Sequence, residues 1–158
     1  GEVAGGMAEK VVDIVKAIEG IKAGTLQPAS LDLAHNLIGD LVEKLAAALE
    51  DNVSIETLDL TFNNITDHSG TRLGATLKQN KTIRTMVLKN NMIGEKAAAT
   101  IAEGLEVNST LTCLDLTGNC IEEAAGARLI RSLSTQAALL QLELAFNRVA
   151  PGGAAQLG

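Results

Sequence analysis

A phrase of apolar residues that ends in asparagine recurs along this chain at a fixed interval of 28 residues. In each copy two variable residues follow the first apolar position, one follows the second, and two separate the third from the asparagine. The asparagines of the four regular copies are Asn63, Asn91, Asn119 and Asn147. A period of about 20 to 50 residues is typical of stacked structural units. We therefore expect a solenoid and not a globule built around one pocket.

A fifth, weaker copy of the phrase precedes these four. It reads Leu31-Asp-Leu33-Ala-His-Asn36, with Pro28 in the first apolar position and a step of 27 residues from Asn36 to Asn63. The repeats predicted from the sequence are 28–54, 55–82, 83–110, 111–138 and 139–158, the last of them truncated.

A second apolar pattern follows each asparagine phrase and predicts a helix. Leucine or isoleucine recurs at a spacing of four, as at Leu73 and Leu77, which places the pair on one helix face. A small residue stands at a constant place before each pair, where we expect the helix to approach the sheet closely. These small residues are Gly70, Ala98, Gly126 and Ala154. The helices are predicted to end at asparagines in the left-handed conformation, at Asn52, Asn80 and Asn108.

The asparagine phrase itself alternates apolar and polar residues, which predicts a strand. Leu58 and Leu60 then point toward the helices, and the residues on either side of them point to the other face. Successive strands pair in parallel, with helices on one side of the sheet only. Because a helix is wider than the strand spacing of about 4.8 Å, the stack curves with its strands on the inside. The predicted fold class is α/β, a horseshoe with a parallel concave sheet and convex helices.

The asparagine at the end of each phrase has a predicted structural role. Its side chain turns inward just past the strand, where the amide can satisfy backbone groups of its own turn and of the next one. A column of such amides would hold adjacent repeats in register. The predicted column is Asn36, Asn63, Asn91, Asn119 and Asn147.

Both ends of the chain lack the complete pattern. Residues 1–27 precede the first repeat, and within them residues 7–20 are predicted to form an amphipathic helix that ends at Gly20. This segment is either a capping helix or the helix of a partial repeat. At the other end, residues 151–158 begin the helix of the fifth repeat and then stop. We expect a fragment of a longer array, because an intact solenoid shields its last strand with a capping unit.

The pattern L-x-x-L-x-L-x-x-N-x-I, followed by G-x-x-x-L-x-x-x-L-x-x-N-x-T, resembles leucine-rich repeats of the long, helix-bearing class typified by ribonuclease inhibitor. The resemblance covers about residues 28 to 158. Repeats of this class are similar to those of cytosolic NOD-like receptors, of the GTPase-activating protein for Ran and of the actin-capping domain of tropomodulin. The resemblance implies a right-handed leucine-rich-repeat horseshoe that binds proteins, and it does not choose among these branches.

Composition and charge disfavour several other classes of protein. The net charge of −6 and the 13 scattered basic residues argue against nucleic-acid binding. No apolar run approaches the roughly 18 residues of a membrane helix, so neither a membrane span nor secretion is predicted. Cys113 and Cys120 have no second pair of ligands nearby. This favours free thiols in the cytoplasm over a disulfide framework or a metal site.

Other short motifs carry no predicted chemistry. Asn-x-Ser/Thr sequons begin at Asn52, Asn64, Asn80 and Asn108. Three of them recur at one place in the repeat, so we interpret them as part of the repeat and not as glycosylation sites. His35 and His68 are predicted in turns, and the paired carboxylates Glu122 and Glu123 fall at a helix boundary, without partners at catalytic spacing. We expect no enzyme, no cofactor, no metal and no small-molecule substrate.

The candidate partner-binding residues are those that face outward on the predicted concave sheet. They are Asp32, Thr57, Asp59, Thr61, Thr85, Val87, Lys89, Cys113, Asp115, Thr117, Gln141 and Glu143. The middle column of this face is mostly acidic. Like charges on neighbouring strands destabilise a sheet, which favours a basic partner that meets them. The alternative is that Leu-Asp-Leu is a common sequence pattern of this repeat class and needs no basic partner. Lys89 is then expected within reach of both Asp59 and Asp115.

Phe62 and Phe146, the two aromatic residues of the chain, share the position before the asparagine. They form either an edge that a partner grips or part of an apolar spine under the turns. The spine is favoured, because phenylalanine inside a leucine-rich stack is usually part of the core. Tryptophan and tyrosine, which dominate interface hot spots, are absent, so we expect weak binding by this stretch alone.

The predicted function is a non-catalytic scaffold for protein–protein interaction, which binds a protein of unknown identity through the concave sheet face and adjoining loops. One alternative is a regulator of a small GTPase or another nucleotide-binding protein, as the Ran activator and NOD-like receptors suggest. The other is a docking element of a cytoskeletal or axonemal assembly. We expect a monomer, with edge-to-edge pairing of the end strands as the alternative.

Overall fold

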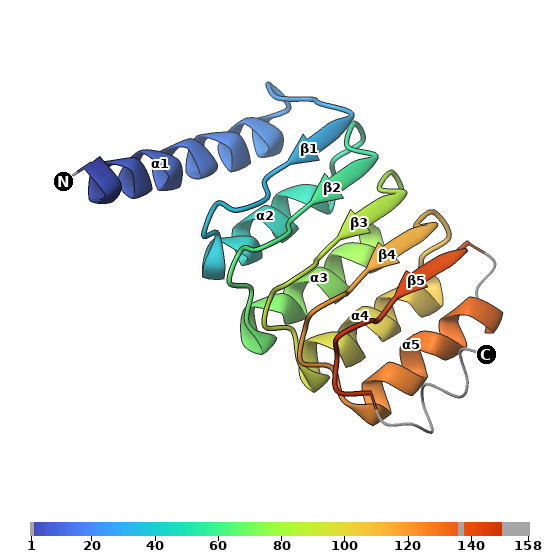
Figure 1. Ribbon diagram of the computed structural model, residues 1–158. Helices are drawn as coiled ribbons and strands as arrows, with labels where there is room; N and C mark the ends of the chain where they lie inside the picture. The colour runs from blue at the N-terminus through green and yellow to red at the C-terminus, as the bar shows by residue number, and fades with distance from the viewer. Residues whose placement is uncertain (1, 136–137, 150–158) are drawn as a thin grey trace.

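The computed structural model describes residues 2–135 and 138–149, so the helix predicted after Asn147, with its small residue Ala154, lies outside the described residues. Helices and strands alternate along the chain (Figure 1). The strands are β1 (Ser30–Asp32), β2 (Thr57–Asp59), β3 (Thr85–Val87), β4 (Cys113–Asp115) and β5 (Gln141–Glu143). The helices are α1 (Glu2–Ala23), the 3-10 turn η1 (Gly39–Leu41), α2 (Val42–Leu49), α3 (Asp67–Gln79), α4 (Glu95–Val107) and α5 (Glu123–Thr135).

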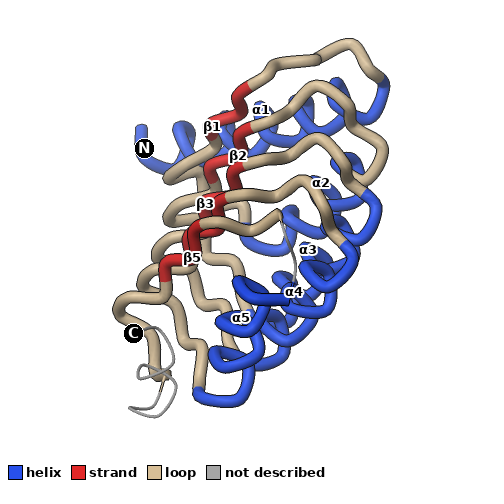
Figure 2. The backbone as a smooth tube through the Cα atoms, turned by 90° about the vertical axis from the view of Figure 1, so that its right-hand side faces the viewer, coloured by secondary structure: helices blue, strands red, loops and turns tan. Residues whose placement is uncertain are grey.

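The strands form one parallel sheet in chain order, β1-β2-β3-β4-β5. Equivalent residues of successive repeats are paired, as Leu58 with Met86 and Met86 with Leu114. The shorter first repeat keeps this register, because Leu31 pairs with Leu58. The helices lie on one side of the sheet, and no described element covers the opposite face (Figures 1 and 2). The predicted fold class is confirmed.

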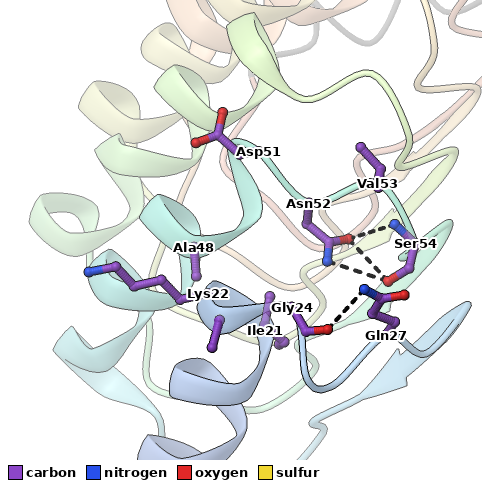
Figure 3. A pocket seen from close by; sticks show the side chains of 10 residues that line it. Ile21, Lys22, Gly24, Gln27, Ala48, Asp51, Asn52, Val53 and Ser54 are labelled. Carbon is purple, nitrogen blue, oxygen red and sulfur yellow. Dashed lines mark hydrogen bonds between the residues drawn. The ribbon is translucent and has the colours of Figure 1, made fainter.

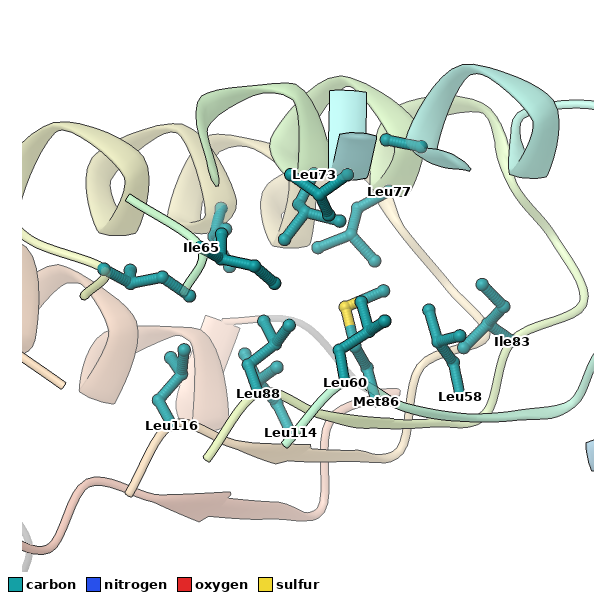
Figure 4. Packing of buried hydrophobic residues seen from close by; sticks show 14 of the residues in the cluster. Leu58, Leu60, Ile65, Leu73, Leu77, Ile83, Met86, Leu88, Leu114 and Leu116 are labelled. Carbon is teal, nitrogen blue, oxygen red and sulfur yellow. The ribbon is translucent and has the colours of Figure 1, made fainter. Parts of the chain in front are cut away.

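Apolar side chains of the strands and helices meet in a layer between the sheet and the helices (Figure 4). Leu58 and Leu60 are completely buried, as the alternation predicted. Leu73 and Leu77 of α3 are buried against the same layer, so the spacing of four identified the helix face that packs. Burying one leucine side chain contributes about 1.5–3 kcal/mol. Because each repeat adds a similar set of side chains, one continuous core runs through the stack.

Helices α3 and α4 approach closely at two glycines that the sequence reasoning did not single out. A Cβ atom at Gly74 would collide with the backbone carbonyl of Thr100, and one at Gly104 would lie 2.6 Å from the carbonyl oxygen of Gly74. Gly70 is also confined, since its Cβ would lie 3.1 Å from the Cβ of Ala97. Gly70 thus faces the next helix as well as Ile65 and Ile93, each 3.5 Å away, whereas a Cβ atom at the equivalent Gly126 would meet Val149.

Helix α1 is longer than predicted. It begins at Glu2, continues through Gly20 and ends at Ala23, so the predicted end at Gly20 was wrong. Gly24 stops the helix with a φ of 76°, a conformation that glycine adopts without steric penalty. Among its described side chains, the buried apolar ones are Ile14, Ile18 and Ile21. None of the described helices combines the length and the apolar composition that a membrane crossing requires.

Candidate protein-binding face

The asparagine that closes each strand connects its own repeat to the preceding one. Oδ1 of Asn63 accepts hydrogen bonds from the backbone N–H of Asn36 at 3.0 Å and of Ile38 at 3.2 Å. Its Nδ2 donates to the carbonyl of Leu33 at 2.9 Å and to that of Thr61 at 3.2 Å. One buried amide thus satisfies backbone groups of two repeats. The sequence reasoning placed the second set of groups in the following repeat, and the structure places it in the preceding one.

The same bonds recur at the later asparagines of this column. Backbone N–H groups of the preceding repeat donate to Oδ1, namely Ile65 to Asn91 (3.1 Å), Ile93 to Asn119 (3.0 Å) and Ile121 to Asn147 (3.0 Å). Carbonyls of the preceding repeat accept from Nδ2, namely Leu60 from Asn91 (3.0 Å), Leu88 from Asn119 (2.9 Å) and Leu116 from Asn147 (2.8 Å). Asn36, at the start of the column, donates within its own repeat, to Ala34 at 3.0 Å. The strand ends are therefore held at a constant spacing.

A second column of asparagines lies at the helix ends, and sequence reasoning missed its role. Asn80 and Asn108 are buried with extended backbones, φ −70° and −78°, so the predicted left-handed conformation was wrong. Nδ2 of Asn108 donates to the carbonyls of Leu77 at 2.8 Å and Asn80 at 3.2 Å. Its Oδ1 accepts from the N–H groups of Thr110 at 2.9 Å and Leu111 at 2.7 Å. The recurring sequons were the signal that could have identified this column.

The open face of the sheet carries the predicted binding residues in three columns. Along the stack these columns are Thr57, Thr85, Cys113 and Gln141; then Asp32, Asp59, Val87, Asp115 and Glu143; then Thr61, Lys89 and Thr117. All of them are partly or fully exposed, whereas the leucines and the methionine between the first two columns are buried in β1 to β4. The fold therefore brings together residues from five repeats on one surface.

The aspartates of the middle column also stabilise the turn that follows each strand. Oδ1 of Asp59 accepts from the N–H of Thr61 at 2.9 Å and from its Oγ1 at 2.6 Å. Asp115 accepts from the N–H of Thr117 at 3.0 Å. These hydrogen bonds within the turn explain the aspartate of Leu-Asp-Leu without any binding partner. Lys89, expected within reach of both aspartates, forms an ion pair with neither.

The thiol of Cys113, the cysteine on this face, is not activated as a nucleophile. Burial raises the pKa of the Cys113 thiol above its ordinary value, and the negative charges of Asp115 and Glu143 raise it further. The thiol is therefore protonated at neutral pH, where a thiolate would be the reactive form. Cys113 and Cys120 are both free. Within the part of the chain that the structure describes, no group of three or more His, Cys, Asp or Glu side chains is placed to hold a metal ion.

The two histidines and the paired carboxylates, which were considered as catalytic candidates, lie in turns and at helix ends. His35 lies in a turn, where its ring stacks on Phe62 with 5.0 Å between ring centres. His68 was predicted in a turn and lies in the first turn of helix α3, with Nε2 3.9 Å from Oε1 of Glu43. Glu123 begins α5 directly after Glu122, as expected for residues at a helix boundary.

The residue immediately before each asparagine of the first column has a left-handed backbone, and we call this row the rim. It consists of His35 (φ 60°), Phe62 (55°), Asn90 (55°), Gly118 (73°) and Phe146 (56°). Phe62 is 50% exposed and Phe146 is 88% exposed, so the predicted apolar spine was wrong. The inward position of this turn belongs to the asparagine that follows, which leaves the preceding side chain outside.

Comparisons with known proteins agree with this geometry. A family model described as Leucine Rich repeat matches residues 51–73 and 107–127. No curated protein sequence matches the chain. The solved structure of actin-binding site 2 of leiomodin-1 has a TM-score of 0.79 at 23% identity, covering 90% of this chain and 83% of that one. The C-terminal domain of Caenorhabditis elegans tropomodulin has a TM-score of 0.78 at 11% identity, covering 92% of this chain and 89% of that one.

The repeated strand–helix unit, the parallel sheet and the matched family model define the class. The chain has the leucine-rich-repeat fold that its asparagine interval predicted, and the family model matches two segments of it. At 23% and 11% identity, the likeness to leiomodin-1 and tropomodulin concerns the fold.

Proposed function

We propose that this chain is a non-catalytic scaffold that binds a protein partner through the concave sheet face and the adjoining turns. The observation that carries the proposal is the sheet face opposite the helices, which no described element covers (Figure 2). Two columns of asparagine amides hold its strands at constant spacing, so the surface is formed before a partner arrives. A pre-organised surface loses little conformational entropy on binding.

The chemistry of this face favours a partner with basic side chains. Asp32, Asp59, Asp115 and Glu143 align in the middle column, with Lys89 as the one basic residue among the predicted binding residues. The described hydrogen bonds of Asp59 and Asp115 use Oδ1, so a lysine or arginine can approach the other carboxylate oxygen. Complementary charge of this kind contributes to specificity and to the rate of association.

A charge-reversal pair tests the proposal. Asp59→Lys with Asp115→Lys changes the concave face, and Asp51→Lys with Glu122→Lys gives the same change of net charge at exposed positions outside it. Partners captured from lysate by chemical cross-linking are compared by mass spectrometry, and circular dichroism checks the fold. We expect the first variant to lose a partner that the second retains. Retention by both variants would move the interface to the convex helices.

Actin is a second candidate partner, which the fold likeness to actin-binding site 2 of leiomodin-1 favours. Co-sedimentation with filamentous actin and a pull-down with monomeric actin test it. Under this candidate the chain binds one form of actin, and the concave charge-reversed variant binds it at least about tenfold more weakly. Binding of neither form would remove actin and leave the scaffold proposal to the cross-linking result. Stimulated GTP hydrolysis by a small GTPase would favour the regulator alternative instead.

The proposal also covers the class of the repeats, the role of the N-terminal segment and the oligomeric state of the chain. We place the repeats in the ribonuclease-inhibitor-like class, because the described helices α3, α4 and α5 of the regular repeats each contain 13 residues. Residues 1–27 act as an N-terminal cap, since three isoleucines of α1 are buried. We expect a monomer in the cytoplasm with both thiols reduced, and sedimentation in dilute solution distinguishes it from an edge-to-edge dimer.

A further inference from the structure

The two aromatic residues of the chain, Phe62 and Phe146, occupy the same exposed position of the rim. A leucine-rich stack offers many buried places for an aromatic ring, yet neither ring contributes to the buried core. His35 stacks on Phe62 at 5.0 Å and supports that ring from the side of the first repeat. Burial in the core therefore does not account for phenylalanine at these two places.

The backbone of the rim does not account for phenylalanine either. Phe62 and Phe146 have φ of 55° and 56°, in the left-handed region that bulky side chains disfavour. The two rim positions between them carry Asn90 and Gly118. Asparagine and glycine are the residue types that adopt this conformation most readily. Of the four rim positions from Phe62 to Phe146, two thus carry a residue that suits the left-handed backbone, and two carry an aromatic residue in a strained conformation. Strain kept in an exposed turn indicates a functional requirement.

The spacing of the two rings leaves room for one partner element. Phe62 and Phe146 lie three repeats apart, and three strand steps of about 4.8 Å separate them by roughly 14 Å. Asn90 and Gly118 lie between them and have short side chains or none. The amide of Asn90 lies over Gly118, with Oδ1 at the place that a Cβ atom would take, so neither residue projects a long side chain between the rings. An α-helix with its side chains is about 10–12 Å wide and fits within it.

The charges beside the rim identify the chemistry of that element. Asp59, Asp115 and Glu143 each lie three residues before a rim position, on the strands that lead to Phe62, Gly118 and Phe146. An element held between the two rings therefore enters the concave face beside three carboxylates. Lysine or arginine on that element would pair with them, while its apolar residues contact the rings.

We propose that the rim from Phe62 to Phe146 grips a basic amphipathic α-helix of the partner protein. This inference rests on the proposed function and assigns the partner element and its chemistry. The apolar side of the helix lies between the two phenylalanine rings. Its basic side faces the acidic column of the strands.

Synthetic helical peptides of 18 residues provide the probe. One contains leucine and lysine at helical spacing, and its counterpart has glutamate in place of every lysine. The matched chains are wild type, Phe62→Asn with Phe146→Asn, and Val53→Asn with Val107→Asn, which removes two exposed apolar residues away from the rim. Binding of fluorescein-labelled peptide is measured by anisotropy, and thermal unfolding is recorded for each chain.

We expect the lysine peptide to bind wild type and the valine control alike, and to bind the phenylalanine variant at least about tenfold more weakly. The glutamate peptide should not bind. Because asparagine suits the left-handed backbone, the phenylalanine variant should melt at the same temperature as wild type or higher.

Three results would overturn the inference: no binding of the lysine peptide to wild type, equal binding by the phenylalanine variant, or a lower melting temperature of that variant. The last result would assign the rings a structural role. Captured partners distinguish the two proposals. A partner that survives Phe62→Asn with Phe146→Asn and is lost on concave charge reversal would remove the rim and leave the scaffold proposal standing.

Discussion

The seam between α3 and α4 differs from the seam between α1 and α2. The first closes tightly, because Gly74 and Gly104 let the two helices approach to backbone contact distance. The second holds an open cavity of about 180 Å³ where the two helices end (Figure 3). Its lining includes Ile21, Gly24 and Asn52. Helices α3 and α4 therefore fit one another more closely than the N-terminal helix fits the first repeat.

The helix-end asparagines show the same difference in their hydrogen bonds. Oδ1 of Asn52 accepts from the N–H groups of Ser54 at 3.1 Å and Ile55 at 2.8 Å, and Asn80 makes the equivalent local bonds. Nδ2 of Asn80 reaches the carbonyl of Leu49 across the seam at 2.7 Å. Among the described residues, Nδ2 of Asn52 has only the hydroxyl of Ser54, at 3.4 Å. Amides thus connect one repeat to the next, and Asn52 does not connect the first repeat to α1.

The largest expected effect comes from filling the tight seam. Gly74→Ala should lower the free energy of unfolding by about 2–3 kcal/mol, because its Cβ overlaps the carbonyl of Thr100 and forces the helices apart. Gly20→Ala in α1 is the control, since its Cβ would lie 3.0 Å from a side-chain atom of Leu26. There, the gain in helix propensity of up to about 1 kcal/mol offsets the contact. Urea unfolding measures both free energies of unfolding, and equal losses would contradict the tight packing assigned to Gly74.

Removing one amide of the first column should have the next largest effect. Asn119→Ala leaves the N–H of Ile93 without its acceptor in the core and removes one of the two amide donors to the carbonyl of Leu88, which costs about 1–3 kcal/mol. Asn36→Ala is the matched control, because the side chain of Asn36 donates within its own repeat. It should cost less than about 1 kcal/mol. If Asn119→Ala unfolded at the same denaturant concentration as wild type, the proposed role of this column would be wrong.

The smallest expected effect concerns the thiol on the concave face. Asp115→Asn keeps an acceptor for the N–H of Thr117 but removes a negative charge that raises the pKa of Cys113. The pKa of the thiol then falls toward its ordinary value, and more thiolate is present at a fixed pH. Because burial is the larger cause, we expect alkylation by iodoacetamide at pH 8 to accelerate by only about two- to threefold. A slower reaction would contradict this charge effect.

The asparagine interval predicted the fold well because a repeat fixes register, strand direction and helix face together. Leu58 and Leu60, for example, are buried where the alternation placed them. The two phenylalanines were misplaced because residue type suggested the core, whereas the left-handed turn directs the next residue inward. Helix-end asparagines were misread for a related reason. Backbone preference suggested a left-handed stop, but the buried side chains of Asn80 and Asn108 close the turns themselves.

The candidate face could be located from the sequence, but its local energetics could not. Alternation identified the outward residues, and the registers between strands place them in straight columns. The bond from Thr61 to Asp59 depends on the turn geometry after the strand, which periodicity does not contain. The packing at Gly74 and Gly104 also arises between repeats, so no single repeat reveals it.

The most direct test of amide connection between repeats compares Asn80→Ala with Asn52→Ala. Both variants lose two equivalent local bonds from backbone N–H groups. Asn80→Ala also loses the bonds across the seam to the carbonyls of Leu49 at 2.7 Å and Asn52 at 3.4 Å, whereas Asn52→Ala loses only contacts with the hydroxyl of Ser54 in its own turn. Urea unfolding gives the difference between the two free energies of unfolding. We expect Asn80→Ala to be less stable than Asn52→Ala by about 1–2 kcal/mol. Equal stability of the two variants would contradict this connection between repeats.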